Sequence, residues 1–284
     1  MGVVRKRSKV ALIFRYVLVG IILFWALFMI YWGVVTSLKP PAETFTVTGL
    51  SVPFIQFRPT LENWRTELSV RESRMSLVNS IVVAIFATLI AVALGIPAGY
   101  ALARFKFRRV KNRDLTIWYL SQRVLPPVVV VIPFFLIMRT LRLLDTRLAL
   151  ILVNATFVLP FAVVITRQTF QELPVELEEA AAVDGCSEFA AFWRIALPLA
   201  APTIVAVIAI CVAFTWNEFL FALSLTSLRA KTFPVYLAGA EDTRGVQFWF
   251  MATRAILALG LPVVLAVAIQ RYIVRGLTFG AVKG

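Results

Sequence analysis

The 284-residue sequence contains no histidine and only two cysteines, Cys186 and Cys211. Cys186 lies in an acidic segment and Cys211 in an apolar run, so we expect no disulfide between them. Histidines and closely spaced cysteines are the usual ligands of zinc and of haem iron, so the sequence predicts no such metal site. It also lacks the pattern G-x-x-x-x-G-K-[ST]. We therefore expect no nucleotide site, no bound cofactor and no catalytic residue on this chain.

Acidic residues are scarce as well, at 15 against 29 lysines and arginines, which leaves a net charge of +14. In a soluble protein this excess of positive charge would suggest a nucleic-acid partner. Here the basic residues flank long apolar runs, which is how membrane proteins fix their orientation. We therefore predict a protein that is embedded in the lipid bilayer and does not bind nucleic acid.

Apolar side chains are abundant, at 60% of the residues with a mean hydropathy of +0.86. Soluble domains average about 45–50% apolar residues, and a helix needs about 20 of them to cross a bilayer. The sequence therefore predicts an all-α integral membrane protein with six transmembrane helices. The expected spans are residues 11–37, 76–102, 115–138, 148–169, 202–225 and 253–273.

Two features inside these runs bear on helix packing. In the second run a small residue recurs every four positions from Ala87 to Ala103, which predicts a smooth face where another helix packs closely. A gating contact is the alternative interpretation of this stripe. In the third run, Pro126 and Pro127 stand side by side and indicate a broken helix.

Short basic segments set the expected orientation. Five basic residues lie between Arg5 and Arg15, and six lie between Arg104 and Arg113. Such segments stay in the cytoplasm, so both termini and residues 171–198 should be cytoplasmic. The connection over residues 39–74 is also rich in basic residues, which weakens the rule without reversing it.

The segment over residues 171–198 is acidic, although apolar runs lie on both sides of it. Pro174 followed by Glu176, Glu178 and Glu179 is typical of a helix start. Asp184-Gly185 predicts a turn, and Ser187 is the expected N-cap of a second short helix. In that second helix an apolar face is expected, and Pro198 should close the unit. The residues of this face are Phe189, Phe192, Trp193 and Ala196.

An exposed aromatic face on a small loop needs a partner. One interpretation is a helix that lies on the lipid headgroups, but such helices are usually rich in lysine and arginine. Anionic lipid would repel the acidic cluster of this segment. A protein partner is therefore favoured.

The same segment resembles a known family. From Glu179 it reads EAAAVDG, followed nine residues later by Ile-x-Leu-Pro, and this pattern is similar to the EAA loop of ABC importer permeases. The resemblance implies a type I ABC importer permease fold, located in a bacterial inner membrane, whose cytoplasmic helix-turn-helix docks on an ATPase subunit, where ATP and Mg²⁺ bind. The implied coupling residues are Glu179, Ala180, Ala181, Asp184, Gly185, Phe189, Phe192, Trp193, Ile195, Leu197 and Pro198.

Other stretches resemble the carbohydrate-uptake branch of this family, and more narrowly the six-span permease subunit of maltose-type importers. Among them are GYALARFKFRR, LLDTRLALIL and FTWNEFLFAL. The resemblance implies three regions: residues 1–75 with the first span and an external loop, a permease core over 76–274, and a cytoplasmic tail over 275–284. In the tail, an ATPase contact is implied for Gly280, Val282, Lys283 and Gly284; a frayed terminus is the alternative.

Polar groups inside the spans are candidates for a substrate path. Sugars favour hydrogen-bonding side chains beside an aromatic face. The candidates are Gln122, Arg123, Asn154, Trp216, Asn217 and Glu218. For Arg123 and Glu218 an internal polar network is favoured, because a charge in the bilayer needs water or a partner. For Trp216 and Asn217 both interpretations stay open.

The predicted function is that of a permease subunit of an ATP-driven importer for a sugar, oligosaccharide or polyol. The implied partners are a second homologous permease, an ATPase dimer and an extracytoplasmic solute-binding protein. A permease for another solute, such as glycerol phosphate, an osmolyte or an amino acid, is the first alternative. A stand-alone secondary transporter is the second, although the paired broken segments of an inverted repeat are not evident in the sequence.

Overall fold

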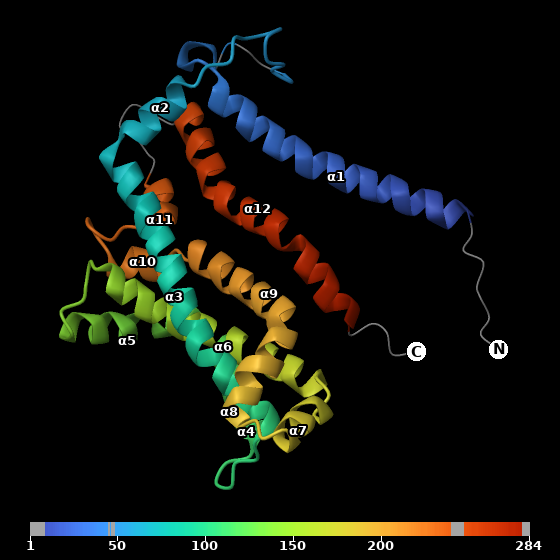
Figure 1. Cartoon of the computed structure of the whole chain (residues 1–284). Coiled ribbons are helices and arrows are strands. Elements are labelled where there is room, and N and C mark those ends of the chain that lie inside the picture. The colour runs from blue at the N-terminus through green and yellow to red at the C-terminus, as the bar shows by residue number, and fades with distance from the viewer. Residues whose placement is uncertain (1–8, 45, 47–48, 240–246, 280–284) are drawn as a thin grey trace. The chain divides into compact units, whose positions relative to one another are not determined.

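The computed structural model describes residues 9–44, 46, 49–239 and 247–279, and throughout these ranges the regular elements are helices (Figure 1). This confirms the expected all-α fold. The α-helices are α1 (Lys9–Leu38), α2 (Glu62–Ser69), α3 (Arg71–Arg104), α4 (Asn112–Val124), α5 (Pro127–Thr140), α6 (Arg147–Glu172), α7 (Glu176–Val183), α8 (Glu188–Ala191), α9 (Leu197–Trp216), α10 (Leu220–Leu225), α11 (Phe233–Ala238) and α12 (Phe248–Phe279). A short 3₁₀ helix covers Pro41–Glu43 and a π-helical turn covers Phe192–Ala196.

Five of the described helices are long and apolar enough to cross a membrane, and a sixth span results if α4 and α5 count as one. These two helices meet at 94°. Leu125 and Pro126 are both extended between them, because a residue before proline avoids the helical conformation. The predicted break at Pro126-Pro127 is thus confirmed.

The chain divides into two units, of which unit 1 comprises residues 1–70 and 240–258. Within it, hydrogen bonds attach α2 to the C-terminal end of α1. The buried amide of Asn63 donates to the carbonyls of Ser37 at 2.9 Å and Lys39 at 2.8 Å. Buried Glu67 pairs with Arg254 at 3.0 Å between the carboxylate and Nε. The other side chains of α1 are largely exposed, as expected for a helix that faces lipid.

Unit 2 comprises residues 71–239 and 259–284, and its core is the contact between α3, α6 and α9. The small-residue stripe of α3 lies in this contact, with Ala87 and Ala91 fully buried. A Cβ atom added to Gly95 would lie 2.5 Å from the Cβ of Ala162 and 3.2 Å from the backbone nitrogen of Val163. Close helix packing, the favoured interpretation of the stripe, is what the structure shows.

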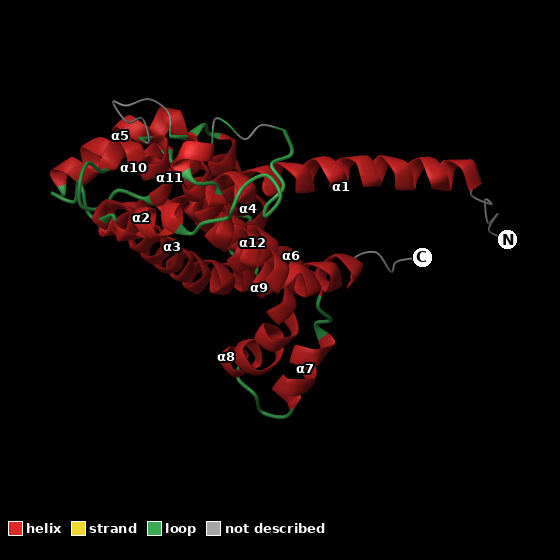
Figure 2. Ribbon diagram, turned by 90° about the horizontal axis from the view of Figure 1, so that it is seen from above, coloured by secondary structure: helices red, strands yellow, loops and turns green. Residues whose placement is uncertain are grey.

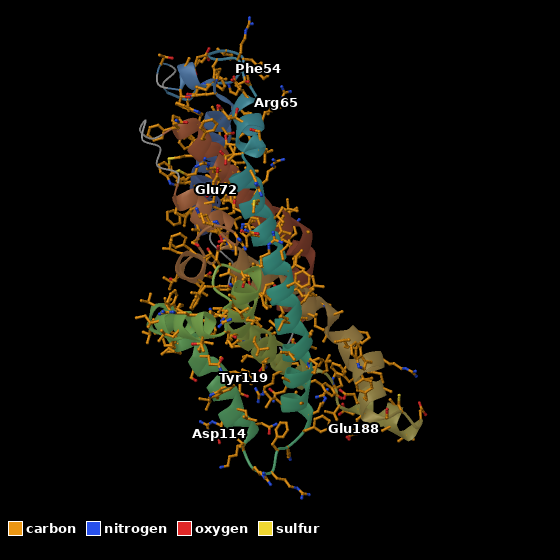
Figure 3. All side chains as sticks on the ribbon, turned by 90° about the vertical axis from the view of Figure 1, so that its left-hand side faces the viewer. Phe54, Arg65, Glu72, Asp114, Tyr119 and Glu188 are labelled. Atoms are coloured by element: carbon orange, nitrogen blue, oxygen red, sulfur yellow. The ribbon has the colours of Figure 1, made fainter. Side chains whose placement is uncertain are left out.

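The short helices α7 and α8 project from the bundle of α3, α6 and α9 (Figure 2). Glu188 of α8 and Asp114 of α4 lie at the same end of this unit, whereas Glu72 lies toward the other end of α3 (Figure 3). The basic connection between α3 and α4 and the acidic segment therefore lie at the same end of unit 2. This is the arrangement that the predicted orientation requires.

Candidate functional site

The acidic segment folds into two short helices, which we call its first and second legs, and the first leg is α7. Glu176, Glu178 and Glu179 occupy its first turn, where carboxylates interact favourably with the helix dipole. The helix begins two residues later than Pro174 suggested. The carbonyl of Val175 accepts from the backbone N–H groups of Glu178 at 2.9 Å and Glu179 at 3.0 Å, so Pro174 lies just outside the helix rather than in its first turn.

The turn after α7 forms as its sequence predicts. Gly185 has a φ of +83°, a conformation that costs other residues energy. The hydroxyl of Ser187 accepts a hydrogen bond from the backbone N–H of Ala190 at 3.3 Å, which makes Ser187 the N-cap of α8. The helix-turn-helix expected over residues 171–198 is therefore present.

The second leg differs from the prediction at its far end. Instead of closing at Pro198, α8 continues through the π-helical turn Phe192–Ala196 directly into α9. The backbone N–H of Leu197 bonds to the carbonyl of Phe192, five residues earlier. A widened turn of this kind absorbs a local disruption of the α-helical ladder, and Pro198 follows in the first turn of α9, where its missing N–H is tolerated.

The aromatic face of the second leg is divided in two. Phe192 and Ala196 are buried, and they pack with Tyr100 and Phe170. Phe189 is 74% exposed and Trp193 is 52% exposed. These two side chains form one wall of an apolar groove of about 320 Å³ beside the last turn of α3. The single apolar face expected from the spacing is thus half core and half open surface.

The remaining predicted coupling residues surround this surface. Five of them are exposed, namely Glu179, Ala180, Asp184, Gly185 and Pro198. Ala181, Ile195 and Leu197 are half-buried. The structure therefore presents an acidic and aromatic surface on the α7–α8 unit, which we define as residues 176–196.

Three residues that join this unit to α3 were not among the sequence candidates. Glu178 accepts hydrogen bonds from the Tyr100 hydroxyl at 2.5 Å and from Arg104 Nε at 2.9 Å. The Arg104 guanidinium also donates to the carbonyl of Leu173 at 3.1 Å. The sequence held one signal for this contact: Tyr100 and Arg104 are four residues apart, which places both on the same face of a helix.

Arg123 and Glu218, expected in an internal polar network, have separate local partners. Both carboxylate oxygens of Glu218 accept from the first turn of α10, from the N–H of Phe221 at 2.7 Å and of Ala222 at 3.0 Å. Glu218 therefore caps the start of α10, a separate short helix that follows the end of α9 at Trp216, so the expected fifth span over residues 202–225 is interrupted.

The guanidinium of Arg123 rests on aromatic rings. It lies 4.0 Å from the ring centre of Phe161 and 5.2 Å from that of Phe214, and it donates to the carbonyl of Phe157 at 3.1 Å. A cation over aromatic faces is stabilised without a carboxylate. Despite these contacts, the Arg123 side chain is exposed.

The other substrate-path candidates differ in exposure. Asn154 and Trp216 are buried, and the amide of Asn154 donates to the carbonyl of Leu150 in its own helix. Asn217 is exposed at the end of α9. Gln122 lines an open groove of about 500 Å³ whose walls are mainly apolar. The candidate tail residues Gly280, Val282, Lys283 and Gly284 lie outside the described residues.

Comparison with known proteins places these features in a family. Residues 95–279 match the model of the family "binding-protein-dependent transport system inner membrane component". The chain is 38% identical to the trehalose transport system permease protein SugB of Mycobacterium tuberculosis, over 92% of this chain and 93% of that protein. It is 34% identical to the trehalose/maltose transport system permease protein MalG of Thermococcus litoralis, over 98% of both chains.

A solved structure shares the fold. One chain of a bacterial ABC transporter involved in the import of the acidic polysaccharide alginate superposes with a TM-score of 0.77 at 21% identity, over 96% of this chain and 99% of that chain. The matched family region contains the α7–α8 unit, the whole of α6 and the last ten residues of α3. The chain therefore belongs to the binding-protein-dependent transport system inner membrane components, the permease subunits of ABC importers.

Proposed function

We propose that this chain is the permease subunit of an ATP-driven importer for a sugar or polyol, and that the α7–α8 unit docks on a separate ATPase. ATP and Mg²⁺ would bind on that ATPase. A second homologous permease and an extracytoplasmic binding protein would complete the importer. The two relatives that are named for trehalose or maltose transport support the substrate class.

The observation that carries the docking proposal is the exposed half of the aromatic face. Phe189 and Trp193 stand open beside the acidic residues Glu179 and Asp184. Exposing two large aromatic side chains to water costs free energy. At protein interfaces, aromatic residues are among those that contribute most of the binding free energy. Basic residues on the partner would complement the acids.

The proposed action follows from how the unit is joined to the membrane helices. The second helix of the unit, α8, runs into α9 without a break. A displacement of α8 would therefore be transmitted along one continuous helix. ATP-driven closure of the partner would then move the spans as rigid bodies between two accessible states. The unit must face the cytoplasm for this, which agrees with the basic connection at the same end of unit 2 (Figure 3).

Co-purification tests the docking. The substitution Phe189→Glu places a charge at the centre of the proposed interface. We expect it to lower recovery of the ATPase by about tenfold or more, since central aromatic residues contribute about 2 kcal/mol or more. The matched control is Leu228→Glu, because Leu228 is 81% exposed and lies in the connection between α10 and α11, beyond the other end of α9. Equal loss in both variants, or no ATPase with the unaltered chain, would overturn the proposal.

A further inference from the structure

The helix α7 has little packing of its own. None of its residues is buried. Before it, Leu173 is extended and separates α7 from α6, and after it the chain turns at Gly185. A helix with a break at each end pivots easily unless side chains fix its direction, because few buried contacts mean low local stability.

Glu178 supplies a contact that fixes this direction. One of its carboxylate oxygens lies 2.8 Å from Arg104 Nη2, and the other accepts from the Tyr100 hydroxyl. The Arg104 and Glu178 side chains are only 10% and 13% exposed. Charge-assisted hydrogen bonds that are shielded from water are stronger than neutral exposed ones.

The same site also contacts the second leg and α6. The ring of Tyr100 lies 4.7 Å from that of Phe192 and 5.3 Å from that of Phe170, measured between ring centres. Arg104 bonds to the carbonyl of Leu173, where α6 ends. The last turn of α3 is therefore joined to α6, α7 and the π-helical turn at a single point.

We propose that Tyr100, Arg104 and Glu178 form a latch that makes α3 move together with the α7–α8 unit. The inference rests on the proposed function and adds a second route for force, beside the continuous helix into α9. Since α3 packs along α6 through its small-residue face, a latched α3 carries the motion into the centre of unit 2. A coupling of this kind needs a stiff joint at the point where force enters.

Hydrogen exchange tests the joint without any partner. In the full chain, reconstituted in lipid nanodiscs, Glu178→Ala should speed amide exchange in α7 by about tenfold or more, because each lost contact raises the population of the open state. Glu178→Gln and Tyr100→Phe, which each keep part of the latch, should give smaller accelerations. The control is Glu176→Ala, an exposed acid in the same turn. It loses only the weak interaction of an exposed carboxylate with the helix dipole, so it should speed exchange much less than Glu178→Ala does.

The complex tests the transmission. With the ATPase bound, addition of ATP should change amide exchange at the cytoplasmic end of α3, over residues 98–105, in the unaltered chain and in Glu176→Ala. Glu178→Ala should reduce this change at least to about a third, while Glu178→Gln retains an intermediate response. An unchanged ATP response in Glu178→Ala, or equal acceleration of α7 in Glu176→Ala, would show that the latch does not carry the motion.

The outcome also separates this inference from the proposed function. If the unaltered chain recruits an ATPase and its α3 responds to ATP, the proposed function stands whatever the latch variants do. If Glu178→Ala prevents assembly, Tyr100→Phe decides, because it removes a single hydroxyl. The latch is then supported by a partial loss of the ATP response and refuted by a full response.

Discussion

Along α3, two regions of one helix make contacts of different kinds. In the middle, Gly95 lets the backbone of α6 approach so closely that even one methyl group has no space. At the last turn, Tyr100 and Arg104 hold α7 through a single carboxylate. The first contact is continuous and apolar, and it resists motion everywhere along its length. The second is small and polar, and it leaves the neighbouring surface open for a partner.

The largest expected effect separates the buried and open halves of the aromatic face. Phe192→Ala should lower the free energy of unfolding by about 3–5 kcal/mol, as is typical when a buried phenylalanine is truncated. Phe189→Ala, three residues earlier and 74% exposed, should stay within about 0.5 kcal/mol of the unaltered chain. Unfolding in detergent, followed by circular dichroism, measures both values. Similar losses would mean that the two halves are not distinct.

The next prediction concerns the close approach of α3 to α6. Gly95→Val should destabilise the bundle by about 1–3 kcal/mol, because the added carbons meet the backbone of α6. The matched control is Gly20→Val in α1, where a Cβ atom would meet nothing within 4 Å. The same unfolding measurement applies. A neutral Gly95→Val would show that the helices separate easily, and that packing does not set the rigidity of this region.

The sequence predicted best those features that depend on neighbouring residues. The small-residue stripe of α3, the Asp184-Gly185 turn and the Ser187 cap follow from spacing and residue type, and each is present in the structure. The break at Pro126-Pro127 follows from the geometry of proline. Local rules suffice because these features require no knowledge of which helices meet.

The missed features depend on contacts between distant segments. The spacing of Phe189 and Phe192 places them on one face of a helix, but α3 and α6 cover only Phe192. Glu178 was expected to interact with the helix dipole, whereas its partners lie 78 and 74 residues earlier in the chain. Nothing in the local pattern of Glu218 separates a cap from a substrate ligand, because a carboxylate beside a helix end suits either role.

At the other end of unit 2, a single carboxylate, that of Asp145, also holds a distant segment of the chain. Its removal should have a smaller effect than the substitutions above. Asp145 accepts hydrogen bonds from the backbone N–H groups of residues 227–230, at 3.1–3.3 Å. Burial alone would raise the pKa of Asp145, but these four donors outweigh it and hold the pKa below its ordinary value. Its φ of 55° suits asparagine as well as aspartate, so Asp145→Asn removes the charge without straining the backbone.

Because the folded protein lowers the pKa of Asp145, the charge stabilises the fold above the unfolded pKa of about 3.9, and this contribution disappears as the pH falls through the folded pKa. Asp145→Asn should therefore cost about 1 kcal/mol or less at pH 7, since solvent screens a half-exposed group. The difference from the unaltered chain should shrink as the pH is lowered below about 4. Unfolding at pH 7 and near pH 3 measures it, with Asp114→Asn as the control at the opposite end of the unit. A difference that is equal at both pH values would mean that the hydrogen bonds of residues 227–230 do not depend on the charge.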